Sequence, residues 1–351
     1  MLTTLLSFAF VLGLLIFVHE LGHFVTAKMV GIKVERFSLG FPPRAFGFIH
    51  GDTDYCISWL PLGGYVKMAG MLDESLDDTI TGAPWEFASK PVWQRMIVIS
   101  AGSIMNFVTA ILIYATIVYI SGIGQTVGTV IGEVIPGKPA EAIGLKADDA
   151  IVSVNGEAVA AWQDLTRLIH SKPKVEITLE WQRGDQILSS KVTPELNDEN
   201  NIGLIGIAPK IAYRDAGVYE SLRQGVVNSY RFLKLTAQSL KLIAIGKQSF
   251  KDAVGGPIII AKLAGESARH GFESLLLFTA FISLNLGFIN LMPFPVLDGG
   301  HLVFLLIEGV MRRPLPIQAR IVIQKIGMAV LLALMVFILI NDISRWDKFN
   351  F

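Results

Sequence analysis

Long apolar runs alternate along the chain with stretches that carry most of its charge. Four of these runs are long enough to cross ~30 Å of hydrocarbon as helices. They cover residues 2–24, 96–120, 275–297 and 326–340. Pro293 and Pro295 interrupt the third run near its end. The pattern predicts a multi-span α-helical membrane protein with about four transmembrane helices.

The region between the second and third runs has a different pattern. Short runs with strand-like alternation are separated by turn residues, which is typical of a small α+β domain. We expect a helix over 162–170, a polar linker over 195–201, and strands over 129–134, 150–154, 175–182 and 188–193. Together they predict a soluble domain over 126–210, outside the membrane.

A second β-prone stretch, YCISWLPLGGYVKMAG, covers Tyr55–Gly70. Two short runs flank Pro61–Gly64, which predicts a hairpin with a glycine-rich turn. The stretch is apolar enough to enter the membrane face, where non-helical backbone is tolerated only inside protein or along a wet cavity. We therefore expect the hairpin to pack near an active site, although an ordinary surface hairpin fits equally well. The acidic residues 71–81 predict a mobile loop.

Residues 219–250 have apolar positions at helical spacing, with Arg223, Arg231, Lys234 and Lys241 between them. This pattern indicates an amphipathic helix at the membrane surface. A helix packed on the soluble domain is the alternative.

These patterns divide the chain into eight segments. They are a first transmembrane helix (1–30), a cytoplasmic region with the hairpin (31–95), a second transmembrane helix (96–121), the soluble domain (126–210), the amphipathic region (216–272), a third transmembrane helix with the segment after it (273–308), a cytoplasmic loop (309–325) and a fourth transmembrane helix (326–343).

Composition supports this interpretation. Of 351 residues, 52% are hydrophobic and only 17% are charged, and the mean hydropathy is +0.52. These values are typical of a membrane protein. The net charge is zero, so no nucleic-acid partner is expected. The one cysteine, Cys56, excludes an intramolecular disulfide and a cysteine-rich zinc site.

Basic residues near the span ends indicate the orientation, because cytoplasmic loops are rich in Lys and Arg. They follow the first span, precede the second and lie between the third and fourth: Lys28, Lys33, Arg36, Arg44, Lys90, Arg95, Arg312, Arg313, Arg320 and Lys325. We expect this side to be cytoplasmic. Both termini and residues 122–272 then lie on the other side.

The first span contains the candidate chemistry, His19-Glu20-Leu21-Gly22-His23. Histidines at i and i+4 share one helix face, so both imidazoles can reach one zinc ion, and the glutamate between them can act as general base. Ionisable residues within a membrane span are costly and indicate function. The alternative is a polar helix end that has already emerged into water.

A catalytic zinc usually has three protein ligands. His50, His170 and His270 lie in predicted loops or in the soluble domain and are expected to be ordinary surface residues. Asp298 and His301 belong to NLMPFPVLDGGH, whose prolines stop a helix and whose glycines allow close backbone approach. This segment is on the same side as His19, and either residue can complete the site.

HELGH, LPLGGYVKM and N-x-x-P-x-P-x-x-D-G-G-H, in this order, make the chain resemble the site-2 protease family of intramembrane zinc metalloproteases. It is most similar to the bacterial group that contains the sigma-E pathway protease, but with one PDZ-like unit instead of two. The resemblance implies Asp298 as third ligand of one Zn²⁺, ahead of His301. It implies that Asn290 binds the substrate backbone or the oxyanion. It also implies that the loop containing Gly64, Tyr65 and Val66 is a re-entrant β-loop, whose edge can bind substrate as an added strand.

The resemblance further identifies residues 126–210 as a PDZ domain through the stretch PGKPAEAIGLKADDAIVSVNGEAV. Where the family usually has glycine, this chain has Asp148. We expect the turn to survive, because aspartate tolerates left-handed backbone better than most residues.

The predicted function is intramembrane zinc endoproteolysis of single-span membrane proteins such as anti-sigma factors and remnant signal peptides, in the bacterial inner membrane. The active site would lie near the cytoplasmic face. The PDZ domain, on the opposite side, would gate access and could bind a peptide or protein tail. A zinc-binding membrane scaffold or transporter with a PDZ module is the alternative, but it has no need of Glu20 as a base.

Overall fold

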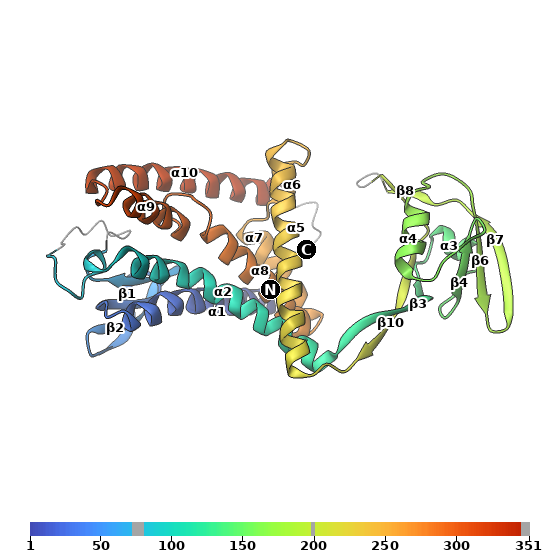
Figure 1. The fold of residues 1–351 in the computed structure, drawn as a ribbon, viewed down its shortest axis with the longest axis horizontal. Coiled ribbons are helices and arrows are strands. Elements are labelled where there is room, and N and C mark those ends of the chain that lie inside the picture. Colours follow the sequence, from blue (N-terminus) through green and yellow to red (C-terminus); the bar gives the residue numbers. More distant parts are fainter. Residues whose placement is uncertain (72–80, 198–200, 345–351) are drawn as a thin grey trace. The chain divides into compact units, whose positions relative to one another are not determined.

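The computed structural model describes residues 1–71, 81–197 and 201–344 (Figure 1). The chain forms two compact units. The helical unit comprises Met1–Ile117 and Val218–Phe351, and the β-rich unit comprises Val118–Gly217. Most of the predicted mobile loop over 71–81, and the end of the predicted linker over 195–201, lie outside the described residues.

Four helices of the helical unit are long and apolar enough to cross a membrane. They are α1 (Leu2–Met29), α2 (Val92–Ser121), α8 (Phe272–Asn290) and α10 (Ile317–Ser344). The four predicted apolar helices are therefore confirmed by length and composition. The third ends at Asn290, before Pro293 and Pro295, and a separate helix, α9 (Asp298–Met311), follows it.

The predicted loop over 309–325 is wrong for most of its length. α9 continues to Met311 and α10 begins at Ile317, so only 312–316 connect them. Arg312 adopts left-handed backbone (φ 52°) where α9 ends, and Pro316 directly precedes α10. The predicted loop is thus a short link between two helices.

The predicted amphipathic helix is α5 (Val218–Ala244). Its small residues Ser221, Gly225 and Ser229 are buried, and the Cα of Gly225 approaches α2, where a Cβ would lie 2.6 Å from the carbonyl oxygen of Ile111. The larger Tyr219 and Tyr230 are exposed. α5 therefore packs within the helical unit through its small residues and leaves apolar side chains outward.

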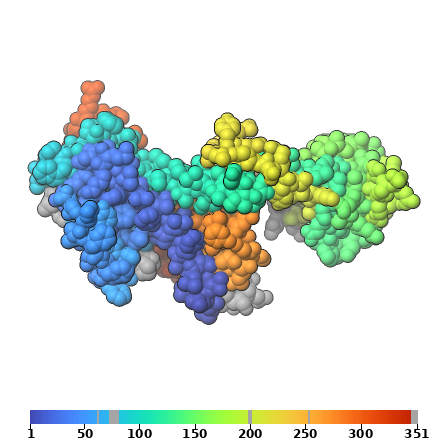
Figure 2. Space-filling view, turned by 90° about the horizontal axis from the view of Figure 1, so that it is seen from below, coloured from blue at the N-terminus to red at the C-terminus, as the bar shows by residue number. Residues whose placement is uncertain are grey.

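The short helix α6 (Phe250–Ala253) precedes α7 (Pro257–Arg269), and α7 packs along the beginning of α1, as the dark blue and orange surfaces show (Figure 2). The carboxylate of Asp342, near the end of α10, accepts hydrogen bonds from the backbone N–H groups of Gly256, Ile258 and Ile259 at 2.9, 3.1 and 3.3 Å. These groups have no partner within their own helix, and a carboxylate is favourable beside a helix N-terminus. A buried charge thereby joins the two helices.

Strands β1 (Val34–His50) and β2 (Thr53–Met68) form a sheet against α1. Phe24 of α1 makes edge contacts with Phe37 of β1 and Tyr55 of β2. The tight turn lies at Gly51–Asp52, between the strands.

The sequence predicted that the two runs flanking Pro61–Gly64 pair with each other, and this pairing is wrong. Phe37 of β1 has Val66 as partner on one side and Tyr55 on the other. Residues 34–39 therefore lie between the two runs, and residues 44–50 pair with the far side of 53–58. Residues 64–68 consequently form one edge of this sheet.

The β-rich unit is built on an antiparallel sheet with strand order β10-β3-β4-β6-β7 and β5 paired to β4. The strands are β3 (Ile123–Val134), β4 (Ala150–Val154), β5 (Glu157–Ala158), β6 (Ile177–Arg183), β7 (Gln186–Val192) and β10 (Ile207–Arg214). Two helices, α3 (Pro139–Ala142) and α4 (Trp162–His170), and the pair β8 (Glu195–Asn197) and β9 (Ile202–Leu204) complete the unit. The four predicted strands and the predicted helix are confirmed. Strands β5, β9 and β10 were not predicted, and β8 lies where the sequence predicted a polar linker.

Asp148 has φ 69°, as expected for the position that usually carries glycine. The next residue, Asp149, is 1% exposed and is bound by the Arg183 guanidinium and the backbone N–H of Lys146. Burial raises the pKa of the Asp149 carboxyl, but these hydrogen bonds outweigh burial and the net pKa is lowered. The ion pair fixes the turn before β4 to the end of β6.

Candidate metal centre

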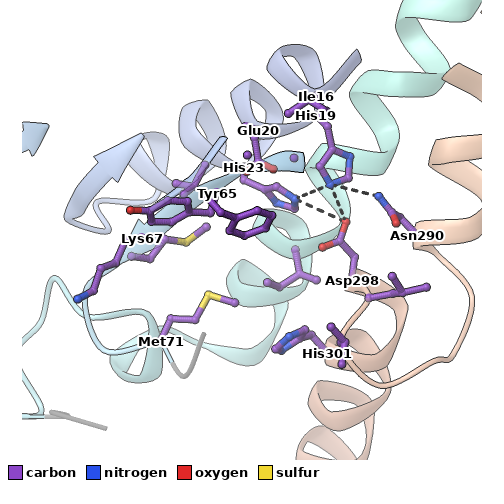
Figure 3. A pocket seen from close by; sticks show the side chains of 18 of the residues that line it. Ile16, His19, Glu20, His23, Tyr65, Lys67, Met71, Asn290, Asp298 and His301 are labelled. Atoms are coloured by element: carbon purple, nitrogen blue, oxygen red, sulfur yellow. Dashed lines mark hydrogen bonds and ion pairs between the residues drawn. The ribbon is translucent and has the colours of Figure 1, made fainter. Parts of the chain in front are cut away.

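α1 places His19 and His23 one turn apart on the same buried face, with 8% and 7% of their surfaces exposed. Their Nε2 atoms are 3.3 Å apart. Asp298, the first residue of α9, brings its Oδ2 to 3.4 Å from His19 Nε2 and 3.5 Å from His23 Nε2. Two segments almost 280 positions apart thus converge (Figure 3).

These three residues are the one group of possible metal ligands found among the described residues, with ligand atoms within 4.8 Å of one another. Tetrahedral zinc with ligand bonds of ~2.0–2.1 Å needs ligand atoms ~3.3–3.4 Å apart. The observed separations of 3.3, 3.4 and 3.5 Å match this requirement. The two-nitrogen, one-oxygen donor set is also one that catalytic zinc uses.

One face of α2 supports all three candidate ligands from behind. The carbonyl oxygen of Val98 lies 2.8 Å from His23 Nδ1, and Ser103 Oγ donates a hydrogen bond to Asp298 Oδ2 at 3.3 Å. The carboxamide of Asn106 lies 3.1 Å from His19 Nδ1. Such outer contacts fix the orientation of metal ligands.

Gly102, on the same face, permits this close approach. A Cβ at this position would lie 2.3 Å from His23 Nε2 and 2.8 Å from His19 Cε1. Sequence reasoning missed Gly102, Ser103 and Asn106. The available signal was Asn106, the one carboxamide in the predicted span 96–120.

A further ion pair fixes α9 to α2. The guanidinium of Arg95 binds both carboxylate oxygens of Glu308, at 3.1 and 2.5 Å, and both side chains are largely buried. Because Arg95 begins the α2 face that carries Val98, and Glu308 lies on the helix that begins at Asp298, the pair fixes the two helices that form the site.

Of the remaining predicted site residues, Asn290 lies at the cluster and His301 does not belong to it. Asn290 Nδ2 is 3.4 Å from His19 Nε2. His301 is set apart from the two histidines of α1 (Figure 3), and its Nε2 is 3.4 Å from Gln324 Nε2 of α10. His50 and His270 are exposed, and His170 belongs to the β-rich unit. None of these three is in the group of possible metal ligands found among the described residues.

A cavity of about 780 Å³ opens beside the cluster. Glu20, Asn290 and the sheet edge Gly64–Met68 line it. Gly64 lies so close to α1 that a Cβ on it would be 2.8 Å from Glu20 Cγ. The structure therefore brings the predicted Gly64, Tyr65 and Val66 to the same space as the two histidines, the aspartate and the glutamate.

The sequence profile of Peptidase family M50 matches residues 7–334. The chain belongs to this family. This confirms the predicted membership of the site-2 protease family: the M50 protein is a zinc metalloendopeptidase that performs intramembrane proteolysis, and its four apolar helices agree with a multi-pass membrane protein.

Relatives that match over nearly their whole length support this family assignment. A predicted zinc metalloprotease of Clostridium perfringens is 35% identical over 329 residues, covering 94% of this chain and 95% of the relative. The Regulator of sigma-W protease RasP of Bacillus subtilis is 30% identical over 418 residues, covering 97% and 98%. Among solved structures, the PDZ domain of a Listeria monocytogenes SdrC-like protein is 26% identical, covers 24% of this chain and 90% of that domain, and has a TM-score of 0.22.

Proposed function

We propose that His19, His23 and Asp298 hold the catalytic zinc of this M50 protease and that Glu20 is its general base. The match between the three ligand separations and tetrahedral zinc carries the proposal. Zinc bound there supplies a Lewis acid that lowers the pKa of water and polarises a peptide carbonyl. Glu20 takes the proton from the attacking water and returns it to the leaving amine.

Asn290 is the proposed oxyanion donor. Its Nδ2 points toward the cluster, at 3.4 Å from His19 Nε2, so an N–H is available to a carbonyl oxygen held between the ligands and the cavity. A donor that is already oriented toward developing negative charge lowers the barrier to attack. His301 has no part in this proposed set.

The sheet edge Gly64–Val66 is the proposed substrate platform. A transmembrane helix must unwind before its peptide bonds can be attacked, and an extended segment can then pair with a sheet edge. In the pairing of the described strands, residues 64–68 have β1 as partner on one side, and the same residues line the cavity. Substrate bound along this edge would pass directly beside Glu20.

We further propose that residues 126–210 are a PDZ domain on the extracytoplasmic side, with the metal centre near the cytoplasmic face. The PGKPAEAIGLKADDAIVSVNGEAV stretch and the distribution of Lys and Arg support this. The substrates would be single-span membrane proteins, including anti-sigma factors and remnant signal peptides, a class that fits a relative named for regulation of sigma-W. Asp185 is exposed, so Asp185→Cys should react with a membrane-impermeant thiol reagent on intact spheroplasts. Protection of this position would reject the orientation.

The decisive experiment compares the wild type with Glu20→Gln on a purified single-span substrate, with zinc content measured on both. We expect the variant to keep its zinc and lose about 10²- to 10⁴-fold in rate, the range that general-base catalysis contributes. His23→Ala is the matched control and should lose zinc as well as cleavage. A Glu20→Gln enzyme that still cuts at the wild-type rate would remove Glu20 from the mechanism.

A further inference from the structure

Asn106, in the middle of α2, is fully buried and directs its carboxamide at the ring of His19. Its Nδ2 lies 3.1 Å from His19 Nδ1. Its Oδ1 is buried, and among the described residues no hydrogen-bond partner reaches it. An unpaired buried carboxamide oxygen is unfavourable and requires an explanation.

The corresponding contact of His23 shows which ring nitrogen of a histidine at this centre carries the proton. His23 Nδ1 lies 2.8 Å from the carbonyl oxygen of Val98, and a carbonyl oxygen can only accept a hydrogen bond. Nδ1 of His23 therefore carries the proton, which leaves the Nε2 lone pair directed at the cluster.

His19 has the same requirement, because its Nε2 is the atom that faces Asp298 Oδ2 and His23 Nε2. Its Nδ1 must then be a donor, and a donor needs an acceptor. In the present orientation, Asn106 Nδ2 faces His19 Nδ1, so two donors face each other and no acceptor is supplied. A half-turn of the carboxamide exchanges two atoms of nearly equal size and places Oδ1 opposite Nδ1. The same half-turn gives the orphaned oxygen its partner.

We propose that Asn106 is a positioning residue for the metal centre: its carboxamide oxygen accepts the Nδ1–H of His19 and so fixes the ring orientation and the tautomer that presents Nε2 to zinc. This inference rests on the proposed role of His19 as a zinc ligand. The Asn106 backbone is itself held, since Ser283 Oγ of α8 donates to its carbonyl oxygen at 2.7 Å. Val98 and Asn106, two turns apart on α2, thus orient the two histidines of α1 in the same way.

The test is the zinc dissociation constant of the full-length purified chain, measured by competition with a chelator. Asn106→Leu keeps the branching at Cγ, at a larger volume, without an acceptor, and Asn106→Ala removes the whole carboxamide; each should weaken zinc binding about 10- to 100-fold, as loss of an outer contact does. Asn106→Asp keeps an acceptor oxygen at the same place and should stay within about threefold of the wild type. Ser283→Ala removes the buried hydrogen bond from α8 to the backbone carbonyl of Asn106 and leaves the carboxamide unchanged, so it should stay within about threefold of the wild type.

Two results would overturn the inference. One is a loss of zinc affinity in Asn106→Asp as large as that in Asn106→Leu, which would mean that zinc binding depends on a donor or on packing at this position and not on an acceptor. The other is wild-type affinity in Asn106→Leu. His19→Ala separates this failure from that of the proposed function: if it binds zinc as the wild type does, His19 is not a ligand and both proposals fall. If it loses zinc while Asn106→Leu does not, only the role of Asn106 is rejected.

Discussion

At the scale of single residues, the metal centre depends on one position that has no side chain. Gly102 lies where a Cβ would be 2.3 Å from His23 Nε2, much closer than packed atoms tolerate. We predict that Gly102→Ala displaces His23 and lowers zinc affinity by about tenfold or more, comparable to the loss of an outer contact. Zinc titration of the purified chain measures this directly.

Gly13→Ala is the matched control for this variant. Gly13 also lies within a membrane-spanning helix, α1, but a Cβ there meets nothing within 4 Å. It should bind zinc as the wild type does. Equal zinc affinity in Gly102→Ala and Gly13→Ala would show that α1 and α2 adjust without cost, and that the close approach is not required.

Residue-level prediction from the sequence reached as far as local spacing allows. His19 and His23 could be paired because i and i+4 share a helix face, and an intervening Glu20 has a chemical meaning only beside a metal. Asp298 and His301 could not be separated by spacing, since both follow the same helix-breaking segment. Asn106 was missed because an amide within an apolar run does not reveal which distant side chain it meets.

At the scale of elements, the testable proposal is that substrate pairs with the edge Gly64–Met68 of β2. We predict that Val66→Pro lowers cleavage about 5- to 30-fold, the equivalent of one or two lost hydrogen bonds, while zinc stays bound. Cleavage of a single-span substrate and zinc content, measured on the same preparation, decide the matter.

The control for Val66→Pro comes from the opposite edge of the same sheet. Phe48 pairs with Tyr55, is 66% exposed and does not line the cavity. Phe48→Pro should therefore disturb the sheet to a similar extent and leave cleavage unchanged. Equal losses in both variants would assign the effect to general damage to the sheet, and unchanged cleavage in Val66→Pro would reject strand addition at this edge.

The pairing of this sheet shows where element prediction ends. Sequence patterns indicate which short runs are strands, but their partners are chosen by tertiary packing. Residues 55–60 and 65–68 were correctly assigned as extended, yet Phe37 lies between them because its ring packs on Phe24 of α1. β10 was missed for the same reason: Arg214 finds Ile123 as its partner, about 90 positions away. Long apolar helices were easier, since their own composition defines them.

At the scale of the whole molecule, the β-rich unit can be removed at a point that the structure defines. Gln125 of β3 pairs with Ala212 of β10, so the chain enters and leaves the unit along neighbouring strands, roughly 5 Å apart. Replacing residues 126–210 with a four-residue Gly-Ser linker should therefore close the chain without strain. The helical unit contains every residue proposed for the metal centre.

This deletion tests whether the proposed PDZ domain gates access to the metal centre. We predict that the shortened protein keeps its zinc, cuts a substrate with a trimmed outer segment at the wild-type rate, and gains cleavage of a substrate with an intact bulky outer domain. The physical reason is steric: a gate acts on what reaches the site and leaves the reacting groups unchanged. The ratio of the two cleavage rates is the measurement, with Glu20→Gln in the shortened protein as the blank. An unchanged ratio would reject gating, and the β-rich unit would then be explained by tail binding alone.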